Sequence, residues 1–323
     1  MKKLFLVLLP VLCFFACGRA TGGSTEQQRV RVQVPLFNAD SAFMFIQNQV
    51  DFGPRVPNTP EHLACAEYLA SELRRFGAQV IEQRADVVTF DGVTLHAINI
   101  IGSFQPENRN RILLFAHWDT RPWADADPNP ANHTKPVLGA NDGASGPGIL
   151  LEIARQIGMQ QPAVGVDIIF FDAEDWGAVN VNLPESWALG AQYWARNPHT
   201  PNYWAEFGIQ VDMAGAPSAT FFREGFSNDF ARNIVDKVWS QARALGFGSF
   251  FINRPSGHII HDHLFVNRIA GIPSISIMYQ STETQHGFGA FWHTIDDTME
   301  HICRRTLNAV GTTILHVIYN HNP

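Results

Sequence analysis

Apolar residues recur along this chain in two patterns that alternate from the N-terminal region to the C-terminus. Short apolar runs bounded by Gly, Pro or polar residues predict β-strands. These strands are expected at residues 80–90, 95–102, 111–116, 166–171, 207–211 and 272–278. Longer segments with apolar positions at helical spacing predict helices. The helices are expected at residues 39–50, 60–76, 147–156, 187–196, 229–245 and 299–319.

The order of these elements predicts the fold class. Asp91-Gly92 separates the first two strands, and this dipeptide is typical of a β-hairpin turn. After the hairpin, strands and helices alternate, which favours a mostly parallel sheet covered by helices on both faces. We therefore expect an α/β fold, a three-layer αβα sandwich with a mixed central sheet, formed by residues 34–323 as a single domain.

The N-terminal segment is typical of an export signal. Two lysines precede an apolar stretch at residues 4–16, which is too short to anchor the folded protein across a bilayer. Residues 14–17, Phe-Phe-Ala-Cys, resemble a bacterial lipoprotein cleavage box. We expect removal of residues 1–16, a lipid on Cys17 and a flexible tether at residues 17–33. The expected product is a periplasmic or cell-envelope lipoprotein that touches the membrane through its lipid only, whereas ordinary signal cleavage is the alternative.

Composition and charge narrow the classes of function. The 323 residues are 46% hydrophobic and 16% charged, which suits a compact globular domain, and we expect a monomer. The formal net charge is −7 and no long basic run is present, so a nucleic-acid partner is not expected. Export permits a disulfide between Cys65 and Cys303, but Cys65 lies in a helical pattern and could equally be a buried thiol. The sequence leaves both alternatives open.

The strand expected at residues 166–171 ends abruptly in Asp172-Ala173-Glu174-Asp175. In open α/β sheets, chemistry gathers at the carboxyl ends of parallel strands. Adjacent Glu174 and Asp175 would carry like charges unless a cation or a shared proton relieves them. A divalent metal bound to one carboxylate, with the other carboxylate serving in proton transfer, would relieve the repulsion between the two charges.

Other strand or loop ends carry side chains of the same kind. Together with the β-strand exit just described, they offer His117, Asp142, Asp175, Asp212 and His293. Imidazole and carboxylate groups in this mixture suit zinc, and no cysteine joins them. Two irregular segments, at residues 122–136 and 178–186, adjoin these positions. Loops in such a place usually shape a pocket, and solvated surface loops are the alternative that composition leaves open.

The order of the motifs resembles a known superfamily. The motifs are His117-Trp118-Asp119, Asn-Asp-Gly-Ala-Ser-Gly at 141–146, Asp-Ala-Glu-Asp at 172–175, Val-Asp-Met at 211–213 and Trp-His-Thr-Ile-Asp-Asp at 292–297. This order is similar to the zinc aminopeptidases and the animal-type glutaminyl cyclases. The last motif and the long insertion between Asp119 and Asp142 are closer to the cyclases. The chain thus resembles the animal-type glutaminyl-peptide cyclotransferases of bacteria.

The resemblance implies a role for each matching residue. One zinc would be bound by Asp142, Asp175 and His293, with Glu174 as the acid/base, Asp212 and Asp262 in a catalytic polar network, and Trp292 at the substrate. Trp187 is a further candidate for contact with the substrate, because it adjoins a candidate site segment. His117 and Asp119 match positions that hold or orient a second zinc in aminopeptidases. The family's acidic pair appears here as His261-Asp262-His263, so either His261 or Asp262 could fill that position.

The implied activity is cyclisation of the N-terminal glutamine of peptides and proteins to pyroglutamate with release of ammonia. The nucleophile would be the α-amine of the substrate, and the cofactor would be one zinc ion per chain. An aminopeptidase with two zinc ions is the first alternative. The second is a catalytically silent lipoprotein that binds peptides in the same cleft.

Overall fold

The computed structural model describes residues 33–179 and 181–321. The predicted signal segment, the lipid site at Cys17 and all but the end of the predicted tether lie outside the described residues and stay predictions. The central sheet has six strands in the order β1-β2-β4-β3-β5-β8. These strands are β1 (Gln79–Val88), β2 (Thr94–Phe104), β3 (Arg111–His117), β4 (Gly165–Phe171), β5 (Phe207–Asp212) and β8 (Ser274–Met278).

The sheet is mixed in the way the sequence predicts. β1 and β2 form an antiparallel hairpin, and β2 pairs antiparallel with β4. The remaining pairs, β4 with β3, β3 with β5 and β5 with β8, are parallel. Every residue of β3, β4 and β5 is buried because helices cover both faces of these strands.

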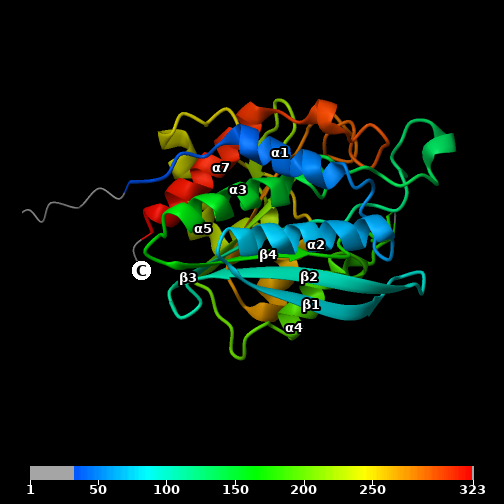
Figure 1. Ribbon diagram of the computed structural model, residues 1–323. Helices are drawn as coiled ribbons and strands as arrows, with labels where there is room; N and C mark the ends of the chain where they lie inside the picture. The colour runs from blue at the N-terminus through cyan, green and yellow to red at the C-terminus, as the bar shows by residue number, and fades with distance from the viewer. Residues whose placement is uncertain (1–32, 180, 322–323) are drawn as a thin grey trace, which may run out of the picture. The chain divides into compact units, whose positions relative to one another are not determined.

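Helices cover the two faces of the sheet unequally (Figure 1). One face packs against α1 (Ala39–Val50), α2 (Pro60–Arg75), α3 (Ser145–Met159), α5 (Gly225–Ala244) and α7 (Arg304–Tyr319). The other face packs against α4 (Leu189–Arg196) and the segment that follows α6 (Asp262–Phe265). This arrangement is the three-layer αβα sandwich expected from the sequence, so the predicted fold class is confirmed.

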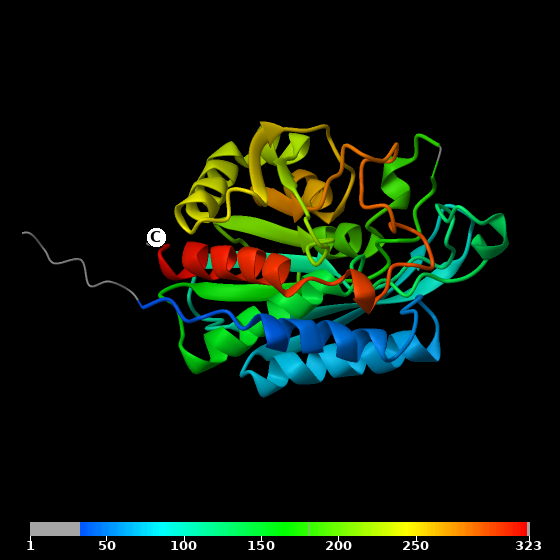
Figure 2. The ribbon, with the colours of Figure 1, turned by 90° about the horizontal axis from the view of Figure 1, so that it is seen from above.

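Several elements differ from the prediction or were not predicted. The helix expected at 299–319 is divided, because a 3-10 turn at Met299–His301 ends before α7 begins at Arg304. β6 (Phe221–Arg223) and β7 (Phe251–Pro255) form a separate parallel pair, beside α5 in Figure 2. β6, β7 and α6 are three to five residues long and are too short to show a period in the sequence.

The two cysteines of the folded part are both free thiols, which decides between the two alternatives left open above. Cys65 is buried in α2, and burial raises the pKa of its thiol to about 12. Among the described helices, none combines the length and the apolar character needed to cross a membrane.

Candidate active site

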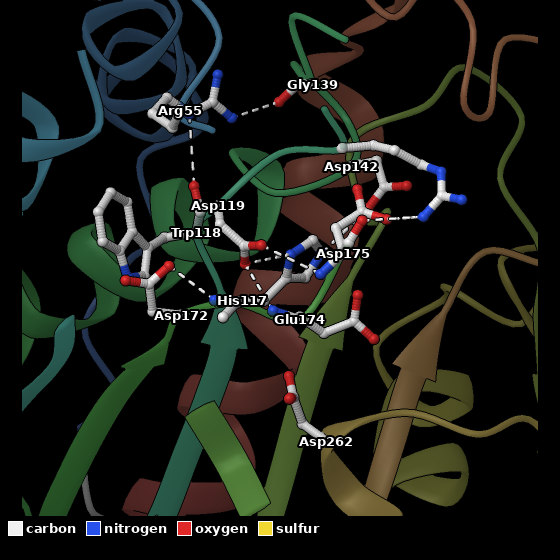
Figure 3. Close-up of polar contacts among 12 residues, drawn as sticks. Arg55, His117, Trp118, Asp119, Gly139, Asp142, Asp172, Glu174, Asp175 and Asp262 are labelled. Carbon is white, nitrogen blue, oxygen red and sulfur yellow. Dashed lines mark hydrogen bonds and ion pairs between the residues drawn. The ribbon is translucent and has the colours of Figure 1, made fainter. Parts of the chain in front are cut away.

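The carboxyl ends of β3, β4 and β5 lie side by side and bring the predicted residues together (Figure 3). His117 is the last residue of β3 and is paired with Phe171, the last residue of β4. Asp212 is the last residue of β5. The side chains that follow these strands therefore converge on one edge of the sheet, as the topology of open α/β sheets requires.

The chain turns sharply after β4. Ala173 has φ +52°, a left-handed conformation that is uncommon for a residue other than Gly, Asn or Asp. Asp172 stabilises the turn, because its Oδ1 accepts the Ala173 N–H at 2.7 Å and its Oδ2 accepts the Ile98 N–H at 2.6 Å. The Asp172 Oδ2 also lies 2.8 Å from Nε2 of His62 on α2. The turn places Glu174 and Asp175 at the sheet edge.

Asp119 orients both of these residues through their backbone. Its Oδ1 accepts the N–H of Glu174 and its Oδ2 accepts the N–H of Asp175, each at 3.1 Å. The Asp119 side chain is fully buried. Because both of its oxygens accept backbone N–H groups, Asp119 fixes the backbone of Glu174 and Asp175 and so orients their side chains.

Asp142, Asp175 and His293 form a buried group that suits a metal ion. One ligand atom from each lies within 4.8 Å of the others. His293 Nε2 is 3.0 Å from Asp175 Oδ1 and 3.6 Å from Asp142 Oδ2. Burial raises the pKa of Asp175, and the negative charge of Asp142 raises it further. A divalent cation would relieve this repulsion, and two carboxylates with one imidazole are a donor set that zinc accepts.

A partly buried ion pair, Arg121 with Asp125, contacts both Asp175 and His293. Arg121 donates to both oxygens of Asp125, at 2.8 and 2.7 Å, and its Nη1 donates to the Asp175 carbonyl at 2.9 Å. Asp125 Oδ1 lies 3.5 Å from Nδ1 of His293. A carboxylate at this nitrogen would leave Nε2 free to bind a metal. The sequence analysis missed Arg121 and Asp125, which flank or lie in an irregular insertion without a periodic signal.

Asp142 is oriented by its backbone in the same manner as Asp175. Asp297 accepts the N–H of Asn141 at 2.8 Å and the N–H of Asp142 at 2.9 Å. Arg55 adds a second tie, because its Nη2 donates to the Gly139 carbonyl at 2.7 Å (Figure 3). The sequence analysis named Asp297 only as part of the Trp-His-Thr-Ile-Asp-Asp motif and assigned it no role.

His117 lies between two carboxylates. Its Nε2 is 3.0 Å from Asp142 Oδ1 and 3.2 Å from Asp212 Oδ1. On the other side of Asp212, His261 Nε2 is 3.2 Å from Oδ2. Burial alone would raise the pKa of Asp212, but the hydrogen bonds from His117 and His261 outweigh it and hold this pKa below its ordinary range. His117, Asp142 and Asp212 are also spaced closely enough to hold a metal ion.

Glu174 is buried beside this network. Burial raises the pKa of Glu174 well above its ordinary value, and the negative charges of Asp262 and Asp175 raise it further. The nearest imidazole is His261, whose Nε2 is 3.7 Å from Glu174 Oε1. A carboxyl group with a raised pKa can hold a proton near neutral pH, as an acid/base requires.

The structure places both His261 and Asp262 at Glu174. The Asp262 carboxylate points toward Glu174 in Figure 3, and both of its oxygens are buried without a hydrogen-bond partner in the described part of the chain. His261 Nδ1 lies 3.5 Å from Asp262 Oδ2. Both residues therefore lie beside Glu174, whereas the sequence analysis expected only one of them to fill this position.

A cavity of 330 Å³ opens over the metal group and Glu174. Trp187 and Trp292, both singled out from the sequence, line it, and the Trp292 ring stacks on the His293 ring with centroids 3.6 Å apart. The sequence analysis missed other wall residues, which lie in irregular segments. They are His258, Ile259, Ile260, His286 and Phe288, and Met213 of the Val-Asp-Met motif also lines the cavity.

Residues 99–318 match the sequence profile of Peptidase family M28. The chain belongs to this family. A zinc-dependent exopeptidase from Parabacteroides distasonis, solved as a crystal structure, is 56% identical, with a TM-score of 0.88 over 90% of this chain and 100% of that chain. The M28 family and the buried groups above suggest zinc as the metal.

Two further relatives of the chain are cyclases, which confirms the resemblance found in the sequence. A Bacteroides thetaiotaomicron glutaminyl cyclase, solved with N-acetylhistamine bound, is 54% identical, with a TM-score of 0.88 over 90% of this chain and 100% of that chain. The glutaminyl-peptide cyclotransferase of Bos taurus is 24% identical over 290 residues, which cover 79% of this chain and 74% of that protein.

Proposed function

We propose that this protein is a zinc-dependent glutaminyl-peptide cyclotransferase, which converts the N-terminal glutamine of peptides and proteins to pyroglutamate and releases ammonia. One observation carries the proposal. This chain is 54% identical to a glutaminyl cyclase over 90% of its own length. It also has a buried carboxyl group with a raised pKa, that of Glu174, next to a group that could hold a metal and in a cavity lined by aromatic side chains.

Asp142, Asp175 and His293 would hold one zinc ion. When bound, zinc supplies a Lewis acid that polarises the side-chain carbonyl of the glutamine. The α-amine of the substrate forms a bond to the side-chain carbonyl carbon, and the bond from that carbon to the amide nitrogen breaks. Glu174 takes a proton from the attacking amine and returns it to the leaving nitrogen, which departs as ammonia.

The cavity walls have a positioning role in this reaction. The reacting amine and carbonyl belong to the same glutamine, so the enzyme must hold a folded-back conformer. Trp187 and Trp292 provide flat apolar walls for such a conformer. Holding two reacting groups in a near-attack geometry can supply about 7–11 kcal/mol of the barrier.

The test of the proposed function is an isotope experiment on a glutaminyl peptide. Cyclisation takes no oxygen from solvent, whereas peptide hydrolysis must add one oxygen atom. We expect ammonia release in ¹⁸O-water with no ¹⁸O in the pyroglutamyl product. Release of a free amino acid, with ¹⁸O in the new carboxylate of the products, would overturn the proposal.

A second candidate activity is that of an aminopeptidase with two zinc ions. His117, Asp142 and Asp212 favour it, because they form a second group that could hold a metal beside the first. The Parabacteroides distasonis relative is described as a zinc-dependent exopeptidase, which favours a peptidase activity. Metal analysis separates the two functions, since the cyclase is expected to contain one zinc ion per chain and the aminopeptidase two.

We also propose, from the sequence alone, that the protein is exported and anchored to the cell envelope by a lipid on Cys17. Wild-type protein should then partition with membranes, and Cys17→Ser should be released or remain unprocessed. A version starting at Gly22 should be soluble, active and monomeric by sedimentation. Equal membrane association of wild type and Cys17→Ser would contradict the lipid anchor.

A further inference from the structure

A second cleft borders the active-site cavity. It has a volume of 340 Å³ and shares Ile259, His286 and Phe288 with the wall of the cavity. We call it the side cleft. Its other lining residues come from β6, β7 and the segments after β7 and β8, and they are Phe222, Arg254, Pro255, Ser256, Gly257, Gln280, Ser281, Thr282 and Gly287.

The backbone of the side cleft is tied to neighbouring elements. The Ser256 N–H donates to the Arg223 carbonyl and the Gly225 N–H donates to the Gly257 carbonyl, each at 3.0 Å. On the opposite wall, Gln280 N–H donates to the Thr220 carbonyl at 2.9 Å, and Thr220 Oγ1 donates to the Gln280 carbonyl at 2.7 Å. The cleft is thus a built feature of the fold.

The wall of the side cleft carries a positively charged side chain, Arg254. Its lining contains no Asp or Glu among the residues that the structure describes. Arg254 lies with its guanidinium 5.0 Å from the centre of the Phe222 ring and makes no ion pair with any described residue. By contrast, the nearby Arg223 is paired with Asp236. Arg254 therefore offers an unneutralised charge to a ligand in the cleft.

Two buried polar groups of the cleft also lack partners. The Gln280 side chain is 7% exposed, and its Nε2 has no acceptor within the described residues. Ser256 Oγ likewise has no hydrogen-bond partner there. A buried donor without an acceptor is costly, so these groups favour a ligand that carries carbonyl or carboxylate oxygens.

We infer that the side cleft binds the peptide residues that follow the N-terminal glutamine and selects an acidic side chain at the second or third position. This inference rests on the proposed function. Ile259, His286 and Phe288 form the wall that the cavity shares with the side cleft, so a peptide held by its first residue in the cavity reaches the cleft by passing them. An extended chain advances about 3.3–3.6 Å per residue. Peptide carbonyls can accept from Gln280 and Ser256, while a carboxylate can pair with Arg254.

The experiment compares C-terminally amidated peptides that differ in one charge. The substrates are Gln-Glu-Ala, Gln-Lys-Ala, Gln-Ala-Glu and Gln-Ala-Lys, with glutamine amide as the substrate that does not reach the side cleft. We expect kcat/KM for ammonia release to favour Glu over Lys by about 5-fold at one of the two positions at low salt, and less at high salt. Glutamine amide should show no salt dependence of this kind.

Two variants assign the selectivity to the cleft. Arg254→Glu should reverse the preference between Glu and Lys and leave glutamine amide turnover unchanged. Arg109→Glu is the matched control, because it makes the same charge change before the first residue of β3, at the end of the strand away from the active site. It should keep the wild-type preference. Gln280→Met should raise KM for the tripeptides by about 5-fold, with kcat and glutamine amide turnover unchanged, because it removes one hydrogen-bond donor.

The outcomes separate the side cleft from the proposed function. Equal kcat/KM for the Glu and Lys peptides, or an unaltered preference in Arg254→Glu, would overturn the inference. Absence of ammonia from glutamine amide and from all four peptides, with zinc bound, would instead overturn the cyclase proposal. In that case, calorimetric binding of the same peptides to wild type and Arg254→Glu still tests the cleft, and equal affinities for the Glu and Lys peptides would overturn it.

Discussion

Asp119 accepts the backbone N–H of Asp175 at 3.1 Å and so orients a residue of the metal-binding group without touching its carboxylate. Asp297 has the same relationship to Asp142, at 2.9 Å. Both supporting carboxylates are fully buried. Hydrogen bonds to the backbone therefore orient Asp142 and Asp175, two members of the proposed metal-binding group.

Asp119→Asn should weaken zinc binding. An asparagine keeps one acceptor oxygen but turns an NH₂ group toward the other backbone N–H, so one of the two clamps is lost. We expect zinc affinity to fall about 10- to 100-fold, the usual effect of losing an outer support of a metal site. Competition with a chelator measures it. The control is Asp296→Asn, an exposed residue next to Asp297, which should bind zinc like wild type. Unchanged affinity in Asp119→Asn would contradict the role of the clamp.

Substitutions at the adjacent residues Glu174 and Asp175 should differ in their effect on zinc content. Glu174→Gln removes the proton shuttle, so turnover should fall by about 100-fold or more while zinc content stays at the wild-type level. Asp175→Ala removes one of three protein ligands and should lose the metal. Zinc analysis and ammonia release on the same samples measure both effects. Near-normal turnover in Glu174→Gln, or full zinc content in Asp175→Ala, would show that the roles are wrongly assigned.

Gly177→Ala should disturb the cavity wall. A Cβ atom at position 177 would overlap Cδ2 of the Trp187 ring, so the ring must move. We expect a higher KM for glutaminyl peptides and a loss of about 1–3 kcal/mol in the free energy of unfolding. Steady-state kinetics and urea unfolding measure these changes. Gly248→Ala is the matched control, because its Cβ would meet only Arg243 Cγ at 3.9 Å. If Gly177→Ala had the same KM and the same free energy of unfolding as Gly248→Ala, the close packing of the Trp187 ring on residue 177 would be contradicted.

Glu224→Gln should lower stability at neutral pH only. Burial alone would raise the pKa of Glu224, but the hydrogen bond from His263 and those from the Ser227 and Ile259 N–H groups outweigh it and lower this pKa to about 2. A lowered pKa in the folded state stabilises the protein above the ordinary value of 4.5, and this stabilisation is lost as the pH falls toward 2.

The difference in the free energy of unfolding between wild type and Glu224→Gln should be roughly 3 kcal/mol at pH 7 and should shrink between about pH 4.5 and pH 2. Urea unfolding of the zinc-free protein at several pH values measures it. Glu107→Gln, at an exposed site, should match wild type throughout. A difference that is the same at pH 7 and pH 2.5 would mean that the Glu224 charge does not stabilise the fold.

The sheet and the convergence of its strand ends could be predicted because long apolar runs carry a clear periodic signal. β4 ends at Phe171 and Asp172 follows, as the abrupt change from apolar to acidic residues indicates. Topology then requires His117, Asp175 and Asp212 to lie at the same edge of the sheet. The sequence could not reveal how each side chain is oriented, since that depends on contacts between distant segments.

The supports of the site illustrate this limit. Asp125 follows no strand and precedes no helix, so nothing in the local sequence indicates that it faces His293. The side cleft is built on β6 and β7, which are too short to show alternation. His286 and Phe288 reach the cavity from an irregular segment, where a chain direction cannot be inferred from residue types.

The hydrogen bond from the Asp142 N–H to Asp297 joins residues 155 positions apart. A growing polypeptide therefore exposes Asp142 and Asp175 well before Asp297 and His293 have been synthesised. Contacts of such high sequence separation form late, because closing a long loop must precede them. In a partly synthesised chain the proposed zinc-binding group lacks His293, so we expect metal uptake to follow the folding of the segment that carries His293 and Asp297.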